Sequence, residues 1–328
     1  MKKRHIAILA VVVLLSCAIP GSFSLRADPA GKADKKGTLQ SFLTQSFDLK
    51  PRFTKGPKRY YRLVIVYKTL DSLGRVISRS EHSGNFERVV ESVDASGKAY
   101  ERIIWKNAAI RNSPGAKDPY GPYKKLEWME NFSYRFSAED THEQLSLDLS
   151  KFPRTMEGYQ SYLLVIDAHF EFDYLRSSYH GAIEKLKRIG DEVEAPDGHI
   201  PFRLDYPPLI PNSDLKKKDV FIKFVGLTQV GGEPCAVISH RQGPGDFYLD
   251  FAMGTPAPVR TEITSIFAGD LIVRLSDGSL VHGDFIEHVR SKLQAPGQAN
   301  PMSGQARADY VIDEISREEY ERPGPGAD

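Results

Sequence analysis

Apolar and polar side chains alternate with a period of two over much of this chain, and this alternation predicts a fold built mainly from β-strands. The pattern is regular in the C-terminal third, where Phe247, Leu249 and Phe251 alternate with Tyr248 and Asp250. Short turns rich in Gly and Asp separate runs of this kind, with no helical pattern between them. This spacing indicates antiparallel sheet and argues against a parallel, doubly wound fold.

The expected fold is therefore mainly β: curved antiparallel sheets, half-barrel or sandwich-like, with one or two packed helices. Residues 156–174 fit a helical stripe and a strand face equally well. We favour a helix over 156–168 and leave the second half of this segment open. A further helix is predicted over 182–189, where apolar residues at helical spacing are followed by Gly190.

Changes in composition divide the chain into six regions. They are a signal peptide (1–27), a flexible spacer (28–45), an N-terminal antiparallel β region (46–155), a helical connecting segment (156–194), a C-terminal β-meander (195–294) and a loosely ordered tail (295–328). The tail begins with a stretch rich in Pro, Gly and Gln, and we expect no more than a single docking helix in it.

The first residues predict export from the cytoplasm. A basic head precedes an apolar run that begins at Ile6 and extends for roughly 14 residues, whereas a membrane-spanning helix needs about 20. Two modes of processing fit. Ser16 and Cys17 resemble the end of a bacterial lipobox, which would make Cys17 an acylated membrane anchor, whereas cleavage after Ala27 would release the chain. Either mode predicts an extracytoplasmic location: periplasmic, anchored at the outer membrane, or secreted.

Charge and cysteine content restrict the partners and scaffolds to consider. With 44 basic and 43 acidic residues, the net charge of +1 provides no field that would attract nucleic acid. The chain has two cysteines, and an acylated Cys17 could not pair with Cys235, so we expect no internal disulfide. Cys235 lies in an apolar strand and is interpreted as a small buried side chain.

Common motifs of catalysis and cofactor binding are missing from the sequence. It contains no Gly-x-Ser-x-Gly elbow, no His-Glu-x-x-His helix, no Walker loop and no Gly-x-Gly-x-x-Gly turn. Active sites are also assembled from distant residues, so an enzyme is not excluded. We expect no cofactor and favour a protein that is not an enzyme.

Residues 167–173 form the first of two segments that could bind a divalent metal. If the segment is a strand, one imidazole and three carboxylates share a face: Asp167, His169, Glu171 and Asp173. If it is a helix, the same residues separate and the site is lost. The alternative interpretation is a solvated face in which His169 pairs with a carboxylate.

The second segment is 282–288. His282, Asp284 and His288 share one strand face, although six residues span about 20 Å in an extended strand, so one ion cannot reach both histidines without a bend. Here too the alternative is a solvated face. Our candidate metal ligands are His169, His282 and Asp284.

Aromatic residues, 15 Tyr and 17 Phe, are frequent on the predicted strand faces. The clearest amphipathic strand is predicted over 126–136. On its apolar face we expect Trp128 and Tyr134 to line a ligand-binding surface, and the alternative is that they belong to the sheet core.

These features predict an exported bacterial envelope protein that binds an apolar ligand or an envelope partner on a concave, aromatic-lined sheet without catalysing a reaction. The alternatives are a metal-assisted hydrolase that uses the histidines above, and a structural scaffold docked through the acidic residues of 313–319. In broad outline, the signal and the strand pattern resemble the open-barrel envelope lipoproteins that carry lipids or other lipoproteins. The resemblance covers no specific motif and assigns no residue.

Overall fold

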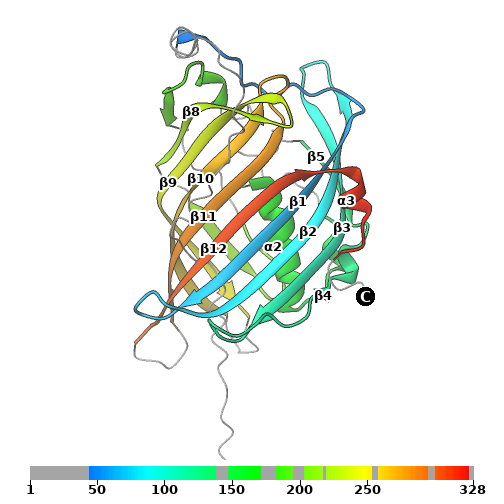
Figure 1. Ribbon diagram of the computed structural model, residues 1–328. Coiled ribbons are helices and arrows are strands. Elements are labelled where there is room, and N and C mark those ends of the chain that lie inside the picture. Colours follow the sequence, from blue (N-terminus) through cyan, green and yellow to red (C-terminus); the bar gives the residue numbers. More distant parts are fainter. Residues whose placement is uncertain are drawn as a thin grey trace, which may run out of the picture.

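The computed structural model describes residues 44–137, 147–170, 182–194, 203–216, 219–252, 258–294 and 300–324. These residues form one antiparallel sheet of 12 strands that curves around a helix (Figure 1). The mainly β, curved antiparallel fold predicted from the alternation is confirmed. The signal peptide, Cys17 and the spacer up to residue 43 lie outside the described residues.

The strands are β1 (Lys58–Leu70), β2 (Val76–Val93), β3 (Ala99–Ser113), β4 (Lys124–Lys125), β5 (Ser133–Phe136), β6 (Glu192–Glu194), β7 (Asn212–Lys216), β8 (Val220–Val230), β9 (Glu233–Phe251), β10 (Val259–Arg274), β11 (Leu280–Leu293) and β12 (Met302–Ile315). The α-helices are α2 (Met156–Phe170) and α3 (Arg317–Glu321), and short 3₁₀ turns are η1 (Glu127–Met129), η3 (Leu149–Lys151) and η5 (Ile183–Lys185).

Strand β12 joins the two halves of the sheet. The strand order is β4-β3-β2-β1-β12-β11-β10-β9-β8-β6, with β5 beside β3 and β7 beside β9. Ile312 of β12 lies opposite Leu63 of β1 on one side and opposite Gly283 of β11 on the other. The two β regions expected from the sequence are therefore continuous with each other, and a strand from the far end of the chain connects them.

The prediction of a loosely ordered tail is wrong for residues 302–315, which form this central strand. Its inward-facing residues include Ala306, Ala308, Tyr310 and Ile312, all buried. Because two of these four are alanine, the apolar alternation is weak in the sequence. A docking helix follows the strand, as allowed for in the prediction, and this helix is α3.

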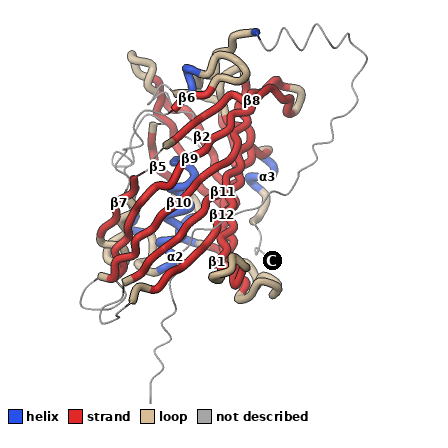
Figure 2. Tube along the Cα trace, turned by 90° about the vertical axis from the view of Figure 1, so that its left-hand side faces the viewer, coloured by secondary structure: helices blue, strands red, loops and turns tan. Residues whose placement is uncertain are grey.

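Helix α2 lies inside the curve of the sheet, while α3 lies on the opposite, convex side (Figure 2). The helix favoured over 156–168 is thus confirmed. Leu164, Val165 and Ile166 are successive and fully buried. A helix enclosed on nearly all sides has no polar face, which explains why this segment fitted both a helical and a strand period.

Residues 126–136 do not form one continuous strand, so this prediction is wrong. They form η1 and then β5, and Asn131 between them takes a left-handed φ of 59°. Backbone hydrogen bonds with β3 fix this path: Asn131 N–H donates to the Trp105 carbonyl and Trp105 N–H donates to the Phe132 carbonyl, each at 2.9 Å. Tyr134 and Phe136 are nevertheless buried, as a strand face would have placed them.

The helix predicted over 182–189 is also wrong, because only η5 forms there. The carboxylate of Asp191 accepts hydrogen bonds from the backbone N–H groups of Lys187 (2.8 Å) and Arg188 (2.7 Å). This local capping competes with helical hydrogen bonding. Gly190 follows at a φ of 99° and turns the chain toward β8.

The concave face of the sheet is filled by the protein itself. Its side chains and those of α2 belong to one continuous apolar core, whose large members include Tyr61, Leu63, Phe86, Trp105, Leu164, Ile166, Ile238, Leu271 and Phe285. Burial of this surface is the main favourable contribution to folding.

None of the described helices combines the length and apolar character needed to cross a membrane.

Candidate functional site

A strap of residues 44–57 crosses one end of the curved sheet, which we call the mouth: the end where β1 begins and where β10 and β12 finish (Figure 1). Backbone hydrogen bonds tie the strap down at two places. Phe47 N–H donates to the Lys187 carbonyl, and Arg52 N–H donates to the Asp277 carbonyl, both at 2.7 Å. The strap therefore spans from the β8 side of the sheet to the turn between β10 and β11.

Close packing holds the strap against that turn. Gly278 has a φ of 68°, and a Cβ atom added there would lie 2.8 Å from the Cα atom of Pro51. Glycine alone avoids both the strained backbone and the clash. Leu49, two residues before Pro51, is fully buried.

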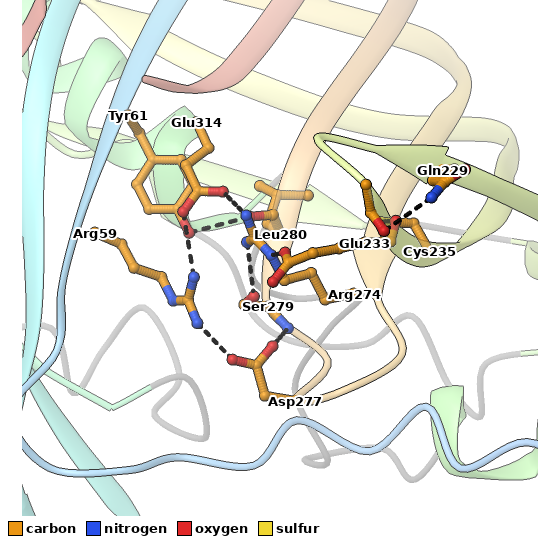
Figure 3. A network of polar contacts seen from close by, with 11 residues as sticks. Arg59, Tyr61, Gln229, Glu233, Cys235, Arg274, Asp277, Ser279, Leu280 and Glu314 are labelled. Carbon is orange, nitrogen blue, oxygen red and sulfur yellow. Dashed lines mark hydrogen bonds and ion pairs between the residues drawn. The ribbon is translucent and has the colours of Figure 1, made fainter. Parts of the chain in front are cut away.

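Arg274, the last residue of β10, is the centre of a polar network at the mouth (Figure 3). Its guanidinium forms ion pairs with Glu233 of β9 and Glu314 of β12, and Nη1 donates to Ser279 Oγ at 3.1 Å. Burial opposes the charge on Arg274, but the hydrogen bonds to Glu314 and Glu233 outweigh it and raise the pKa. Arg274 thus links the ends of three strands as a permanent cation.

Arg59 of β1 extends this network to the turn. Its guanidinium pairs with Asp277 and, through Nη1, with Glu314 Oε1 at 3.2 Å (Figure 3). Burial alone would raise the pKa of Asp277, but hydrogen bonds from Ser279 and the charge of Arg59 outweigh it and lower that pKa. Because Asp277 stays ionised, the turn that contacts the strap is bound electrostatically to β1.

A cavity of about 230 Å³ lies between the strap and these strands, and we call it the mouth pocket. Its charged wall consists of Arg52, Arg59 and Arg88 together with Glu101 and Asp277. Arg88 and Glu101 form a buried ion pair, with side chains 7% and 5% exposed. Arg88 Nε donates to Glu101 Oε2 at 2.6 Å.

The rest of the pocket wall is apolar or neutral. Phe53 and Pro57 come from the strap, and Val90 comes from β2, on the same face as Arg88. Tyr61 comes from β1, where its hydroxyl donates to the Leu280 carbonyl at 3.2 Å. The described residues that line the pocket include no histidine and no cysteine. This lining suits a molecule with an anionic and an apolar part.

Trp128 and Tyr134, predicted as ligand-lining residues, lie away from the mouth pocket, between the sheet and α2. Trp128 is half-buried, and its Nε1 donates to Ser161 Oγ of α2 at 3.0 Å. Tyr134 is buried, and its hydroxyl lies 2.5 Å from His169 Nε2. Both side chains thus bind α2 to the sheet, as in the alternative core interpretation.

The candidate metal ligands lie on opposite sides of the sheet. His169 is buried on the concave side, where its ring centroid lies 4.0 Å from that of Phe136. His282 is on the convex side, with Nδ1 at 2.6 Å from Asp313 Oδ1, and the exposed Asp284 is two residues further along β11. Within the described ranges, no three His, Cys, Asp or Glu residues converge on a point that could hold a metal.

The strand-face version of the 167–173 site requires a strand that does not form, because α2 continues to Phe170. Glu171 and Asp173 lie outside the described residues. Cys235 is buried and is a free thiol in the part of the chain that the structure describes, and burial raises its pKa.

Sequence reasoning missed the mouth network. Its charged members come from the beginnings or ends of β1, β9, β10 and β12 and from one turn, so no local pattern unites them. The available signal was the turn at 276–279, identified only as a connection between strands.

No family model matches the chain, and no curated protein matches it significantly. Among solved structures, it is similar to a protein from Parabacteroides distasonis provisionally described as a lipoprotein, with 11% identity, a TM-score of 0.22, and coverage of 83% of this chain and 99% of that chain. It is also similar to a mutant porin of Rh. blastica, with 10% identity, a TM-score of 0.19, and coverage of 79% and 99%. Similarities at this level carry no argument about function.

Proposed function

We propose that this chain is an exported protein of the bacterial cell envelope that binds, without a chemical reaction, a small amphipathic anion in the mouth pocket. The observation that carries the proposal is the guanidinium of Arg88, buried in the wall of a cavity whose other side is apolar. Export rests on the basic and apolar segment at the start of the sequence.

Two features support an anion rather than a neutral ligand. The pocket places three arginines around one small space, each paired with a carboxylate: Arg52 with Asp48, Arg59 with Asp277 and Arg88 with Glu101. A guanidinium carries five N–H donors, so pairing with one carboxylate does not exhaust its capacity to bind a further anion. Guanidinium groups bind carboxylate and phosphate oxygens in a forked geometry, so such a ligand would contact several of them at once.

The apolar part of the ligand follows from the opposite wall. Phe53, Pro57 and Val90 would contact a short alkyl chain while its head group faces Arg88. We place the ligand in the mouth pocket rather than at the site expected from Trp128 and Tyr134. Helix α2 already occupies the space beside those two residues, inside the filled core.

Octanoate is a suitable probe, because it carries one carboxylate and a chain short enough for a cavity of about 230 Å³. Calorimetric titration should detect its binding to the wild-type protein, whereas octanol should bind more weakly. The variant Arg88→Met/Glu101→Leu removes the buried cation and its partner together. Loss of a charge-assisted contact worth about 1.5–3 kcal/mol predicts a roughly 10- to 100-fold weaker octanoate affinity.

Arg102→Gln is the matched control, because Arg102 is an exposed arginine of the same strand as Glu101 and does not line the pocket. We expect it to bind octanoate like the wild type. Wild-type affinity in the Arg88→Met/Glu101→Leu variant, or equal binding of octanol and octanoate, would refute the assignment.

Anchoring is a separate part of the proposal, and it depends on Cys17. Acylation there would hold the protein at the membrane through a spacer, with the strap as the first described segment. Cell fractionation of wild type and Cys17→Ala separates the two modes of processing: a shift from the membrane to the soluble fraction supports the anchor, and identical fractionation supports ordinary cleavage.

A further inference from the structure

The convex face of the sheet carries a second pocket, under the C-terminal segment 316–324, which we call the latch. The latch contains α3, and Tyr320 of that helix is buried against Tyr60 of β1, with ring centroids 4.9 Å apart. Asn107 of β3 fastens its end, because Nδ2 donates to the carbonyls of Tyr320 (3.3 Å) and Arg322 (2.9 Å). The latch therefore lies against the side of the sheet opposite to α2 (Figure 2).

The cavity between the latch and the sheet, the latch pocket, has a volume of about 280 Å³, close to the lower end of small-molecule sites. Arg62 and Val64 of β1 and Ser83 and Asn85 of β2 form its floor. Val64 lies opposite Ser83 and Arg62 lies opposite Asn85, so Arg62 and Ser83 are diagonal neighbours, with backbones about 7–8 Å apart. One ligand group can thus reach both side chains.

Ser83 is the first sign that a ligand belongs here. The residue is only 8% exposed, and its hydroxyl has no hydrogen-bond partner in the described structure. A buried hydroxyl without a partner costs about 1–3 kcal/mol, so native proteins seldom leave one unless something else satisfies it.

Arg62 is the second, independent sign. Among the described residues, it forms no ion pair within 4.0 Å, although, beside the hydrogen bonds from Ser316, its charge contributes to the lowered pKa of Glu319. Its hydrogen-bond partner is Asn85 Oδ1, which accepts from Nε at 3.2 Å. The carboxylate opposite it on β12, Asp313, bonds instead to His282. The terminal nitrogens of Arg62 are therefore available for a carboxylate fork.

The acidic residues of the latch pocket are already engaged with other partners. Glu81 pairs with Arg111 at 2.7 Å and accepts a hydrogen bond of 2.5 Å from the Tyr123 hydroxyl. Glu319 caps α3 by accepting from the backbone N–H and the hydroxyl of Ser316. Both carboxylates remain close enough to repel a doubly charged ligand, which favours a monoanion over phosphate.

We propose that the latch pocket binds a hydroxylated carboxylate of the sugar-acid type, with Arg62 holding the carboxylate and the Ser83 hydroxyl donating to the same group. The amide oxygens of Asn85 and Asn107 and the hydroxyl oxygen of Tyr123 line the pocket, and each has acceptor capacity for a hydroxyl of such a molecule. This site shares no lining residue with the mouth pocket, so the two proposals stand or fall separately.

Glucuronate is the probe. Glucose, which lacks the carboxylate, tests the need for charge, and inorganic phosphate, which lacks the sugar ring, tests the need for the hydroxyls. Calorimetric or NMR titration in the millimolar range should show binding of glucuronate by the wild-type protein and weaker binding of the other two. Arg62→Gln should weaken glucuronate binding about 10- to 100-fold, and Arg290→Gln, an exposed arginine of the convex face outside this pocket, should leave it unchanged.

Ser83→Ala provides a second test, in which stability and glucuronate binding are measured on the same variant. Because it removes a buried hydroxyl without a partner, it should leave the urea midpoint unchanged or raise it, while glucuronate binding weakens several-fold. Undetectable glucuronate binding, tighter binding of glucose or phosphate, or wild-type affinity in Arg62→Gln would each overturn the proposal. A lowered urea midpoint in ligand-free Ser83→Ala would also overturn it, since the hydroxyl would then have a structural partner.

Discussion

Replacing Glu101 by Gln should be among the most destabilising single substitutions at the mouth. The change keeps the size of the side chain but removes the negative charge beside Arg88, and both side chains are more than nine-tenths buried. Removing one partner of a buried ion pair costs about 3–5 kcal/mol, because the remaining charge is left uncompensated. The amide oxygen of Gln can still accept from Arg88 Nε, so we expect a loss near 3 kcal/mol.

Removing both charges of this ion pair should have a much smaller effect on stability. Arg88→Met/Glu101→Leu removes both charges and should lie within about 1 kcal/mol of the wild type, because buried ion pairs are often replaced by apolar residues without loss. Arg102, which lies next to Glu101 in β3, forms an exposed ion pair with Glu91 of β2 at 3.0 Å, with side chains 47% and 36% exposed. Arg102→Gln breaks this pair and should cost about 0–1 kcal/mol.

Urea unfolding followed by circular dichroism and tryptophan fluorescence gives the free energies, provided that the two signals change together. Two results would contradict the expected effect of burial: a Glu101→Gln variant that loses no more stability than Arg102→Gln, or a double variant as unstable as Glu101→Gln. Such results would mean that solvent screens the Arg88–Glu101 pair despite its low exposure.

Three further predictions concern packing, pH and topology. Gly84→Ala should cost about 1–3 kcal/mol in urea unfolding, because its Cβ would lie 2.9 Å from Trp105 Cζ3; an unchanged midpoint would show that α2 and the sheet can separate slightly there. The hydrogen bond that His282 donates to the Asp313 carboxylate raises the pKa of His282 above 6.5. The stabilisation from this pair is therefore full below pH 6.5 and is lost as pH rises through the folded-state pKa. Asp313→Asn should flatten this part of the stability–pH curve, and an unaltered curve would contradict the assignment. Deleting 300–328 should abolish cooperative unfolding, because β12 connects β1 to β11, and a cooperative, native-like truncated protein would contradict the role given to β12.

The candidate site was largely beyond prediction from the sequence, for a physical reason. About 215 residues separate Arg59 from Arg274, and about 40 separate Arg274 from Glu314. Strand pairing alone brings these three side chains together. The convex-side histidines were placed correctly on a strand, since His282 follows the predicted alternation. Whether any neighbour completes a site on that face depends on register, which alternation does not determine.

Local chemistry was sufficient for the class of fold. Alternation of apolar and polar residues, with turns such as 276–279, predicts antiparallel strands because the side-chain period and the turn conformations are properties of a few consecutive residues. The same local reasoning favoured a helix at 156–168, although it could not exclude a strand, because a segment buried on all sides carries no polar face to reveal its period.

Only the tertiary structure decided which strands are neighbours and what fills the curved sheet. The position of β12 between β1 and β11 depends on contacts more than 200 residues apart, and its two inward alanines gave the sequence little sign of them. The interior became core rather than cavity because α2 folds back into it, and the arginines met at the mouth because the strand ends converge there. Long-range pairing and packing of this kind are energetic outcomes of the whole chain, so no short stretch of sequence encodes them alone.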